Sequence, residues 1–364
     1  MTTIFDVARR AGVSTATVSR VLNGTAEVTA ELAAKVRAAA QETGYEPNRV
    51  ARRLRTQRSS VWSVIISDIR NPFFTELIPG VEEVAFSRGN SVILCHAGED
   101  LAREATYLRL AAAEAVAGVI LSPASPVRTD VQPVLSRGIP VVTVDRRLSD
   151  VALDHVLVDN MHGAQQATAH LISVGCRRLA CVCGPLETTT GADRYAGYQR
   201  ALLAAGRAAE AREVEVGDFR EEGGYLATQK LLARREMPDG IFVSNNMMAL
   251  GALRALDDAG LSVPADVAVV GFDDPVWAPL LKPSLTAVAQ PNYDIGQEAA
   301  RLLLSRIEGY TGAAREVVLA PTLRTRDSTR RTALNPVKPA EAADPVAVPR
   351  VRGDGSRRRA ARPS

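Results

Sequence analysis

The chain has 364 residues, 46% of them hydrophobic, and at roughly 150 residues per domain this length suggests two or three domains. Its formal charge of +3 hides a segregation, because residues 1–60 carry a net charge of +5 and residues 330–364 carry +6, whereas residues 61–329 carry −8. This distribution argues against a nucleic-acid surface on the central part of the chain and restricts such a surface to the two ends.

Two short amphipathic helices are predicted near the N-terminus. The apolar positions that recur there at three- and four-residue intervals are Val7, Ala8, Ala11, Val18, Val21 and Leu22. Thr3 and Asp6 have the spacing of a capping box at the start of the first helix. Gly12 separates the two helices, and Ser14 is placed to cap the second. This pattern predicts two helices that meet across a short turn.

The second helix has an outer face that suits a major groove. With its apolar residues inside, the residues left outside are Thr15, Ala16, Ser19 and Arg20. Ala16 and Arg20 lie one turn apart, so the face is small at its N-terminal end and carries one long cation. The alternative is a plain structural helix pair.

A third helix and a basic segment complete the N-terminal part. Thr29 caps the predicted third helix and Gly44 ends it. Asn48 can cap a further helix over 49–55, which contains four arginines and is too short to be stable alone in water. We interpret it as a hinge helix that orders against DNA and a second copy of itself, with a solvated basic linker as the alternative.

From residue 61 the sequence alternates between apolar runs and helical patterns, which is typical of parallel sheets with crossover helices. Strands are expected over 61–67, 91–96, 118–121, 140–144, 155–158, 179–183, 240–243, 267–271 and 285–289. Helices are expected over 74–88, 163–174, 192–205, 223–234, 247–259 and 293–308, among others. Residues 330–364 lack periodicity, and we expect a disordered basic tail.

Polar and aromatic side chains follow the predicted strands, where open α/β sheets bind ligands. The groups in such positions include Asp68, Asn71, Phe73, Phe74, Asp145, Arg146, Asp159, Asn160, Arg194, Asn245, Asn246, Asp273, Asp274 and Trp277. Carboxylate and guanidinium groups bind pairs of hydroxyls, and aromatic rings cover C–H faces, so the set suits a neutral polyhydroxylated ligand. Asp68, Asp159 and Asp274 are equally suited to be helix caps or ties between lobes.

Several motifs together resemble the LacI/GalR family of bacterial transcription regulators. They are Asp6-Val7-Ala8 through Gly12-Val13-Ser14, the string from Thr17 to Asn23, and Tyr45-x-Pro47-Asn48-x-x-Ala51-x-x-Leu54. The resemblance covers residues 2 to about 329. It implies an N-terminal all-α helix-turn-helix head and a periplasmic-binding-protein-like α/β sensor of two Rossmann-like lobes.

The resemblance also implies domain boundaries. They are a head over 1–46, a hinge over 47–59, a ligand-sensing and dimerisation domain over 60–329, and the tail. Within that domain the N-lobe comprises about 60–160 and 290–320, and the C-lobe about 161–289 and 321–329. The implied partners are a second copy of the chain, pseudo-palindromic operator DNA and a small-molecule effector.

Residue roles follow from the resemblance and from the patterns above. The DNA-binding candidates are Ser14, Thr15, Ala16, Thr17, Ser19, Arg20, Asn23, Asn48, Arg49, Ala51 and Leu54, with Leu54 as a minor-groove wedge. The effector-binding candidates are Asn71, Phe73, Phe74, Asp145, Arg146, Asn160, Arg194, Phe219, Asn246, Asp273 and Trp277. Asn246 replaces a frequent family Asp, and Arg146 replaces the aromatic residue of purine-sensing relatives, which argues against a stacked nucleobase.

Other classes of protein fit less well. No apolar segment follows Met1 and no apolar run is long enough to cross a membrane, so we expect a cytoplasmic protein rather than an exported solute-binding protein. The four cysteines and four histidines show no metal-ligand or nucleophile spacing, and no GxGxxG or GxxxxGK[ST] motif is present. We expect buried reduced cysteines, no enzyme activity, no metal and no cofactor. The predicted function is a repressor of a sugar-utilisation operon released by sugar, with a corepressor-dependent nucleoside or nucleobase sensor as the alternative.

Overall fold

A computed structural model describes residues 2–23, 28–45, 59–208 and 213–331 of the chain. The expected hinge helix over 49–55, with the candidates Asn48, Arg49, Ala51 and Leu54, lies outside the described residues. The expected basic tail lies outside them as well, apart from its first two residues. Among the described residues, no helix is long and apolar enough to cross a membrane.

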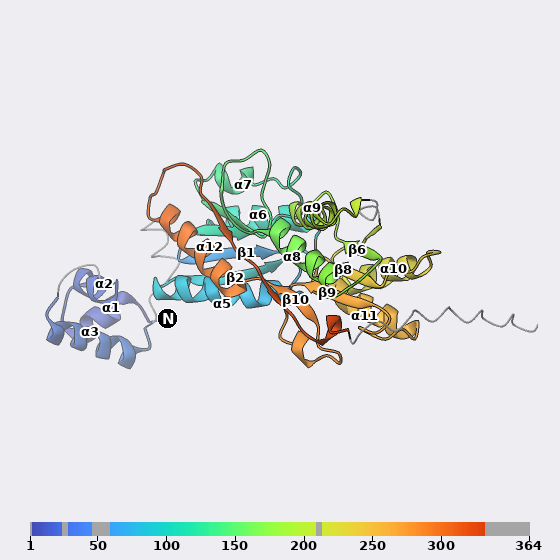
Figure 1. The fold of residues 1–364 in the computed structure, drawn as a ribbon. Helices are drawn as coiled ribbons and strands as arrows, with labels where there is room; N and C mark the ends of the chain where they lie inside the picture. Colours follow the sequence, from blue (N-terminus) through green and yellow to red (C-terminus); the bar gives the residue numbers. More distant parts are fainter. Residues whose placement is uncertain (1, 24–27, 46–58, 209–212, 332–364) are drawn as a thin grey trace, which may run out of the picture. The chain divides into compact units, whose positions relative to one another are not determined.

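The N-terminal head consists of three helices (Figure 1). They are α1 (Ile4–Ala11), α2 (Thr15–Asn23) and α3 (Ala30–Thr43). The Asp6 carboxylate accepts hydrogen bonds from the backbone N–H and the hydroxyl of Thr3, and the Ser14 hydroxyl accepts one from the backbone N–H of Thr17. Gly12 ends α1 in the left-handed conformation, as its position between the helices predicts. The predicted caps of α1, α2 and α3 are therefore confirmed, and a small apolar core joins all three helices.

The remaining described residues form two six-stranded sheets. Sheet A has the order β11-β5-β4-β3-β1-β2 and is parallel throughout. Its strands are β1 (Val61–Ile66), β2 (Ser91–His96), β3 (Gly118–Leu121), β4 (Val141–Val144), β5 (Asp154–Val158) and β11 (Glu316–Leu319). Sheet B has the order β12-β10-β9-β8-β6-β7, with only β12 antiparallel to its neighbour. Its strands are β6 (Leu179–Cys183), β7 (Val214–Val216), β8 (Gly240–Val243), β9 (Ala268–Phe272), β10 (Thr286–Ala289) and β12 (Thr322–Arg324).

Helices cover both faces of each sheet (Figure 1). The helices on sheet A are α5 (Pro72–Ser87), α6 (Leu101–Ala113), α7 (Gln132–Leu135) and α12 (Asn292–Ile307). The helices on sheet B are α8 (Asn160–Ser173), α9 (Thr189–Ala204), α10 (Glu221–Leu232) and α11 (Asn246–Asp258). We call sheet A with its helices the N-lobe and sheet B with its helices the C-lobe. The predicted combination of an all-α head and two α/β lobes is confirmed.

The chain passes between the lobes three times, after β5, after β10 and after β11. The strands that the sequence did not predict are β7, β11 and β12, which lie at sheet edges and are partly exposed. β7 and β12 are only three residues long, and β11 alternates between exposed and half-buried residues, so none of the three is a fully buried strand. All four cysteines are buried and free, as expected.

Two glycines allow α5 and α12 to approach closely in the N-lobe. A Cβ atom on Gly80 would lie 2.2 Å from the carbonyl oxygen of Tyr293, and one on Gly296 would lie 2.1 Å from that of Leu77. Both distances are impossible for a real side chain, so the helices contact each other through their backbones. This contact fixes α12, and with it the chain segment that returns from the C-lobe.

A buried carboxylate ties the same helix to the sheet. Asp154 at the start of β5 accepts hydrogen bonds from Arg306 at 2.7 and 3.0 Å and from the Arg315 side chain at 2.7 Å. Its side chain is fully buried. Although burial opposes ionisation, the two guanidinium groups lower the pKa of Asp154 from 3.8 to about 2.

We expect Asp154→Asn to lower the free energy of unfolding by about 3 kcal/mol at neutral pH, because it leaves two arginines facing a neutral amide. The folded-state pKa lies below the unfolded value, so this stabilisation is complete above about pH 4 and is lost as the pH falls toward 2. Denaturant unfolding of both proteins across this range measures the difference. The control is Asp150→Asn, which removes an exposed carboxylate, and a difference that persists at pH 2 would contradict the assignment.

Candidate functional site

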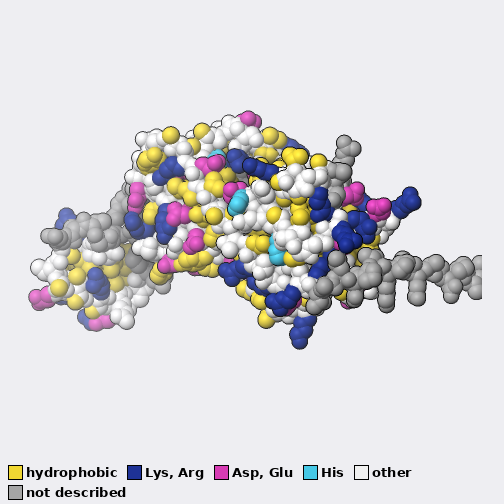
Figure 2. Space-filling model, viewed as in Figure 1, with side chains coloured by type: hydrophobic (Ala, Val, Ile, Leu, Met, Phe, Trp, Pro, Cys, Tyr) yellow, Lys and Arg dark blue, Asp and Glu magenta, His cyan; other side chains and the backbone are white. Residues whose placement is uncertain are grey.

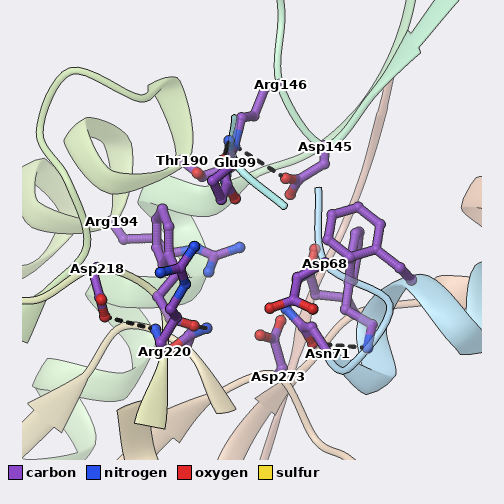
Figure 3. A pocket seen from close by; sticks show the side chains of 15 residues that line it. Asp68, Asn71, Glu99, Asp145, Arg146, Thr190, Arg194, Asp218, Arg220 and Asp273 are labelled. Carbon is purple, nitrogen blue, oxygen red and sulfur yellow. Dashed lines mark hydrogen bonds and ion pairs between the residues drawn. The ribbon is translucent and has the colours of Figure 1, made fainter. Parts of the chain in front are cut away.

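A pocket lies between the two lobes, at the carboxyl ends of strands from both sheets (Figure 3). The N-lobe residues that line it are Asp68, Asn71, Phe73, Phe74, Glu99, Asp145 and Arg146. The other lining residues are Thr190, Arg194, Asp218, Phe219, Arg220, Asn245 and Asp273 of the C-lobe, and Gln290 on one of the connecting segments. The structure thus brings eight of the eleven predicted effector residues into one cavity.

An apolar wall is formed where α5 begins. The side-chain oxygen of Asn71 caps this helix by accepting a hydrogen bond from the backbone N–H of Phe73 at 3.0 Å. The rings of Phe73 and Phe74 meet edge to face, with centroids 4.9 Å apart, and both residues are buried. The wall therefore offers rigid aromatic surface next to a polar amide.

Arg194 on α9 is the central buried cation of the C-lobe side. Its Nε donates to Asn160 at 2.7 Å, its Nη1 donates to the carbonyl oxygen of Ser244 at 2.7 Å, and its guanidinium lies 3.8 Å from the centroid of the Phe272 ring. Burial lowers the pKa of Arg194 from its ordinary value, and the carboxylates of Asp273 and Asp145 oppose that shift. The guanidinium is thus held in one orientation by contacts on its far side.

Four non-glycine residues of the pocket adopt left-handed backbone conformations. Their φ angles are 59° for Glu99, 66° for Asp145, 63° for Phe219 and 70° for Asp273. Among the described residues only one other non-glycine residue, Ala115, has a positive φ. Such conformations cost about 1–3 kcal/mol each and persist where the surrounding structure enforces them. Backbone strain in this protein is therefore concentrated at the pocket.

Three predicted effector residues do not line the pocket. Asn160 lies behind Arg194 and accepts its hydrogen bond, so it orients that side chain. Asn246 spans the lobes by donating to the side-chain oxygen of Asn71 at 2.9 Å, and its own buried side-chain oxygen has no partner among the described residues. Trp277 packs against an apolar cluster of the C-lobe instead of covering a ligand face. Trp277 was predicted from its position after a strand, and that position does not show whether a side chain faces the pocket or an apolar cluster.

The three aspartates for which the sequence left a ligand contact, a helix cap and a tie between lobes open have different roles. Asp159 caps α8 by accepting from the backbone N–H of His162, and Asp274 forms a bidentate ion pair with Arg326. Asp68 lines the pocket and is paired with its neighbour Arg70.

Sequence reasoning missed several lining residues. They are Glu99, Thr190, Asp218, Arg220 and Gln290. Gln290 directly follows β10 and donates to Asp273. Its position at the carboxyl end of a predicted strand is therefore a signal in the sequence for a pocket residue. Asp218 follows β7, an edge strand that the apolar pattern did not reveal.

The head presents the predicted outer face of α2. Ala16 and Arg20 are exposed, Thr15, Thr17 and Ser19 are half-buried, and Val18 is fully buried. Ser14 is exposed at the start of the helix and Asn23 ends it. Figure 2 shows acidic and basic side chains interspersed on the visible face of the two lobes. A small polar helix face with one cation is therefore available for a DNA groove.

Comparisons with known proteins agree with this division of the chain. Residues 3–48 match the model of the bacterial regulatory proteins of the lacI family, and residues 168–329 match a periplasmic binding protein-like domain. The ribose operon repressor of Escherichia coli strain K12 is 36% identical over 330 residues, which cover 90% of this chain and 100% of that protein. The chain belongs to the LacI family.

Two further LacI-family proteins are similar over most of their length. The transcriptional repressor PurR of Pectobacterium carotovorum is 36% identical over 331 residues, covering 90% of this chain and 97% of that protein. The structure of the lac repressor dimer bound to operator and the anti-inducer ONPF has a TM-score of 0.78 at 28% identity, covering 90% of this chain and 99% of that chain. These relatives are transcriptional regulators, and none of them is named as an enzyme.

The charge of Asp145 gives a prediction for this LacI-family pocket. Burial raises the pKa of Asp145, although the nearby Arg146 and Arg194 oppose the shift. Because ionisation is unfavourable there, Asp145→Asn should stabilise the unliganded protein on the order of 1 kcal/mol at neutral pH. Asparagine also tolerates the left-handed conformation at this position.

Thermal melting of the full chain measures this effect. Because the folded-state pKa of Asp145 is raised, the wild type gains stability as the pH falls through it, and the gap to the variant should close. The exposed Asp150→Asn serves as control. A melting temperature below that of the wild type at neutral pH would show that the Asp145 carboxylate stabilises the fold.

Proposed function

We propose that this chain is an operator-binding repressor that a free sugar releases from DNA, with a pentose such as ribose as the first candidate effector. The observation that carries the proposal is the pocket between the lobes, where aromatic rings face carboxylate and guanidinium groups. Sugars offer hydroxyl pairs to such charged groups and C–H faces to such rings. The similarity to a ribose operon repressor supports a pentose.

The geometry supports an effector that binds closed lobes. Phe73 and Phe74 belong to the N-lobe, whereas Arg194 and Asp273 belong to the C-lobe, so one ligand that contacts all four bridges the lobes. A bridging ligand shifts the equilibrium toward the closed arrangement by its difference in affinity. We propose that lobe closure alters the segment that links the head to the N-lobe, and that sugar weakens DNA binding in this way.

A thermal-shift screen tests the effector class, because a ligand that binds only the folded state raises the melting temperature. Pentoses, hexoses, nucleosides and nucleobases form the panel. Stabilisation by a pentose supports the proposal, and stabilisation by a nucleobase alone replaces it with the corepressor alternative. Arg146 favours the sugar, because this buried cation lies where a stacked base would need an aromatic ring.

The DNA-bound form is proposed to be a homodimer on a pseudo-palindromic operator. A single α2 reads only a few bases, and its outer face carries Arg20 as the one long cation. Two heads related by a twofold axis read two inverted half-sites and so gain the required specificity.

Arg20→Ala should cost about 1–3 kcal/mol of operator affinity, as expected for loss of a bidentate contact to guanine. The operator is first selected from random duplex DNA, and affinity for it is compared with affinity for a scrambled duplex. Lys35→Ala removes an exposed cation from α3 and is the matched control. Equal losses on both duplexes would restrict Arg20 to phosphate contacts.

Asp273→Asn should leave operator affinity unchanged and abolish its response to sugar, because the amide keeps the left-handed backbone and loses the carboxylate. In the wild type, sugar should weaken operator binding by the same factor by which operator weakens sugar binding, typically 5–150-fold. Titrating each ligand in the presence of the other measures both factors. A normal sugar response in the variant would remove Asp273 from the proposed site.

A further inference from the structure

Glu99, which is half-buried, forms an ion pair with the buried Arg146 inside the pocket. Its two carboxylate oxygens accept from Nη1 and Nη2 of Arg146, each at 2.7 Å. Arg146 is only 3% exposed. This end-on bidentate geometry is the one by which arginine recognises carboxylate and phosphate groups of ligands. The terminal nitrogens of Arg146 are therefore already engaged by an anion of the protein itself.

A terminal nitrogen of Arg146, Nη1, also donates to the carbonyl oxygen of Pro123 at 3.3 Å, whereas Nε faces a different kind of partner. Nε of Arg146 is buried and forms an ion pair with the Asp145 carboxylate at 3.4 Å, but it makes no hydrogen bond to the described residues. A single N–H beside a carboxylate suits a hydroxyl, which accepts from one group and donates to the other. The negative charge of the Asp145 carboxylate beside this N–H repels an anionic ligand group.

The turn that carries Glu99 has a strained backbone. Gly98 and Glu99 both have positive φ angles, of 70° and 59°. Glycine adopts this conformation freely, whereas glutamate does not. Position 99 therefore carries a carboxylate side chain although its backbone conformation favours glycine.

Contacts from the C-lobe close over the ion pair. Arg220 donates to the carbonyl oxygen of Gly98 at 3.1 Å, and the Phe219 ring centroid lies 5.3 Å from the guanidinium carbon of Arg146. Figure 3 shows Glu99, Arg146 and Asp145 on one side of the pocket. Closure of the lobes therefore shields the pair from water and strengthens it.

We propose that Glu99 is a positioning residue that occupies the anion-binding fork of Arg146 and thereby restricts the pocket to uncharged ligands. The excluded class comprises sugar phosphates and sugar acids, which carry the anion that Arg146 binds when Glu99 is absent. This inference rests on the proposed sugar-binding function of the same pocket.

The test compares Glu99→Gln and Glu99→Gly with the wild type. The amide of glutamine keeps the size of the side chain but cannot accept from both terminal nitrogens. Glycine removes the side chain and suits the positive φ, so this variant should fold at least as stably at the turn. Glu308→Gln is the matched control, because it removes an arginine-paired carboxylate on the surface of the N-lobe.

Binding of D-ribose, D-ribose 5-phosphate and inorganic phosphate to each full-length protein is measured by calorimetry at constant ionic strength. Both Glu99 variants should lose at least tenfold in affinity for D-ribose and gain at least tenfold for the two phosphates. The control should match the wild type. A role in the turn alone predicts instead that Glu99→Gly binds all three probes as the wild type does.

The outcomes separate this inference from the proposed function. If the wild type does not bind D-ribose, the pentose effector is refuted, and the phosphate measurements alone decide the role of Glu99. If neither variant gains phosphate binding, the inference is overturned whatever happens to ribose affinity.

Discussion

The burial of two arginines between the lobes is the interaction on which the pocket depends. Arg194 and Arg146 are each only 3% exposed, and a buried guanidinium is tolerated only when its donors are satisfied. Asn160 and the carbonyl oxygen of Ser244 accept from Arg194, and Glu99 accepts from both terminal nitrogens of Arg146, whose Nε makes no hydrogen bond to the described residues. Ordered groups behind the pocket thus fix the groups that face into it, which reduces the conformational entropy that these side chains lose when a ligand binds.

The fold was predictable wherever secondary structure has a strong local signal. Buried strands such as Gly118–Leu121 and Leu179–Cys183 are continuous apolar runs, and their predicted bounds match the structure. The head was predictable because its caps and glycine stops each have a local cause. The edge strands were not, because Glu316–Leu319 is partly exposed and pairs with β5, a strand more than 150 residues away in the sequence. Pairing over that distance leaves no mark on a local pattern.

The pocket was predictable in location and only partly in membership. Strand order places carboxyl ends together, so Asp145 and Asp273, each directly after a strand, are found by position. Position does not give side-chain direction. Trp277 also follows β9, yet it is half-buried and packs against an apolar cluster of the C-lobe. Asn246 opens α11 but reaches across to the other lobe. Glu99 was missed because its role depends on Arg146, a residue 47 positions away.

Strain and charge burial have one common consequence. The four left-handed residues and the buried carboxylate of Asp145 destabilise the unliganded pocket, and the left-handed residues belong to both lobes. Asp145 of the N-lobe and Asp273 of the C-lobe line the same cavity, so a ligand that supplies donors to both carboxylates recovers part of this cost and holds the two lobes together. The destabilising features are therefore concentrated at the pocket, where ligand binding can offset them. A ligand that bridges both lobes ties its affinity to lobe closure, which is the change that the proposed function requires.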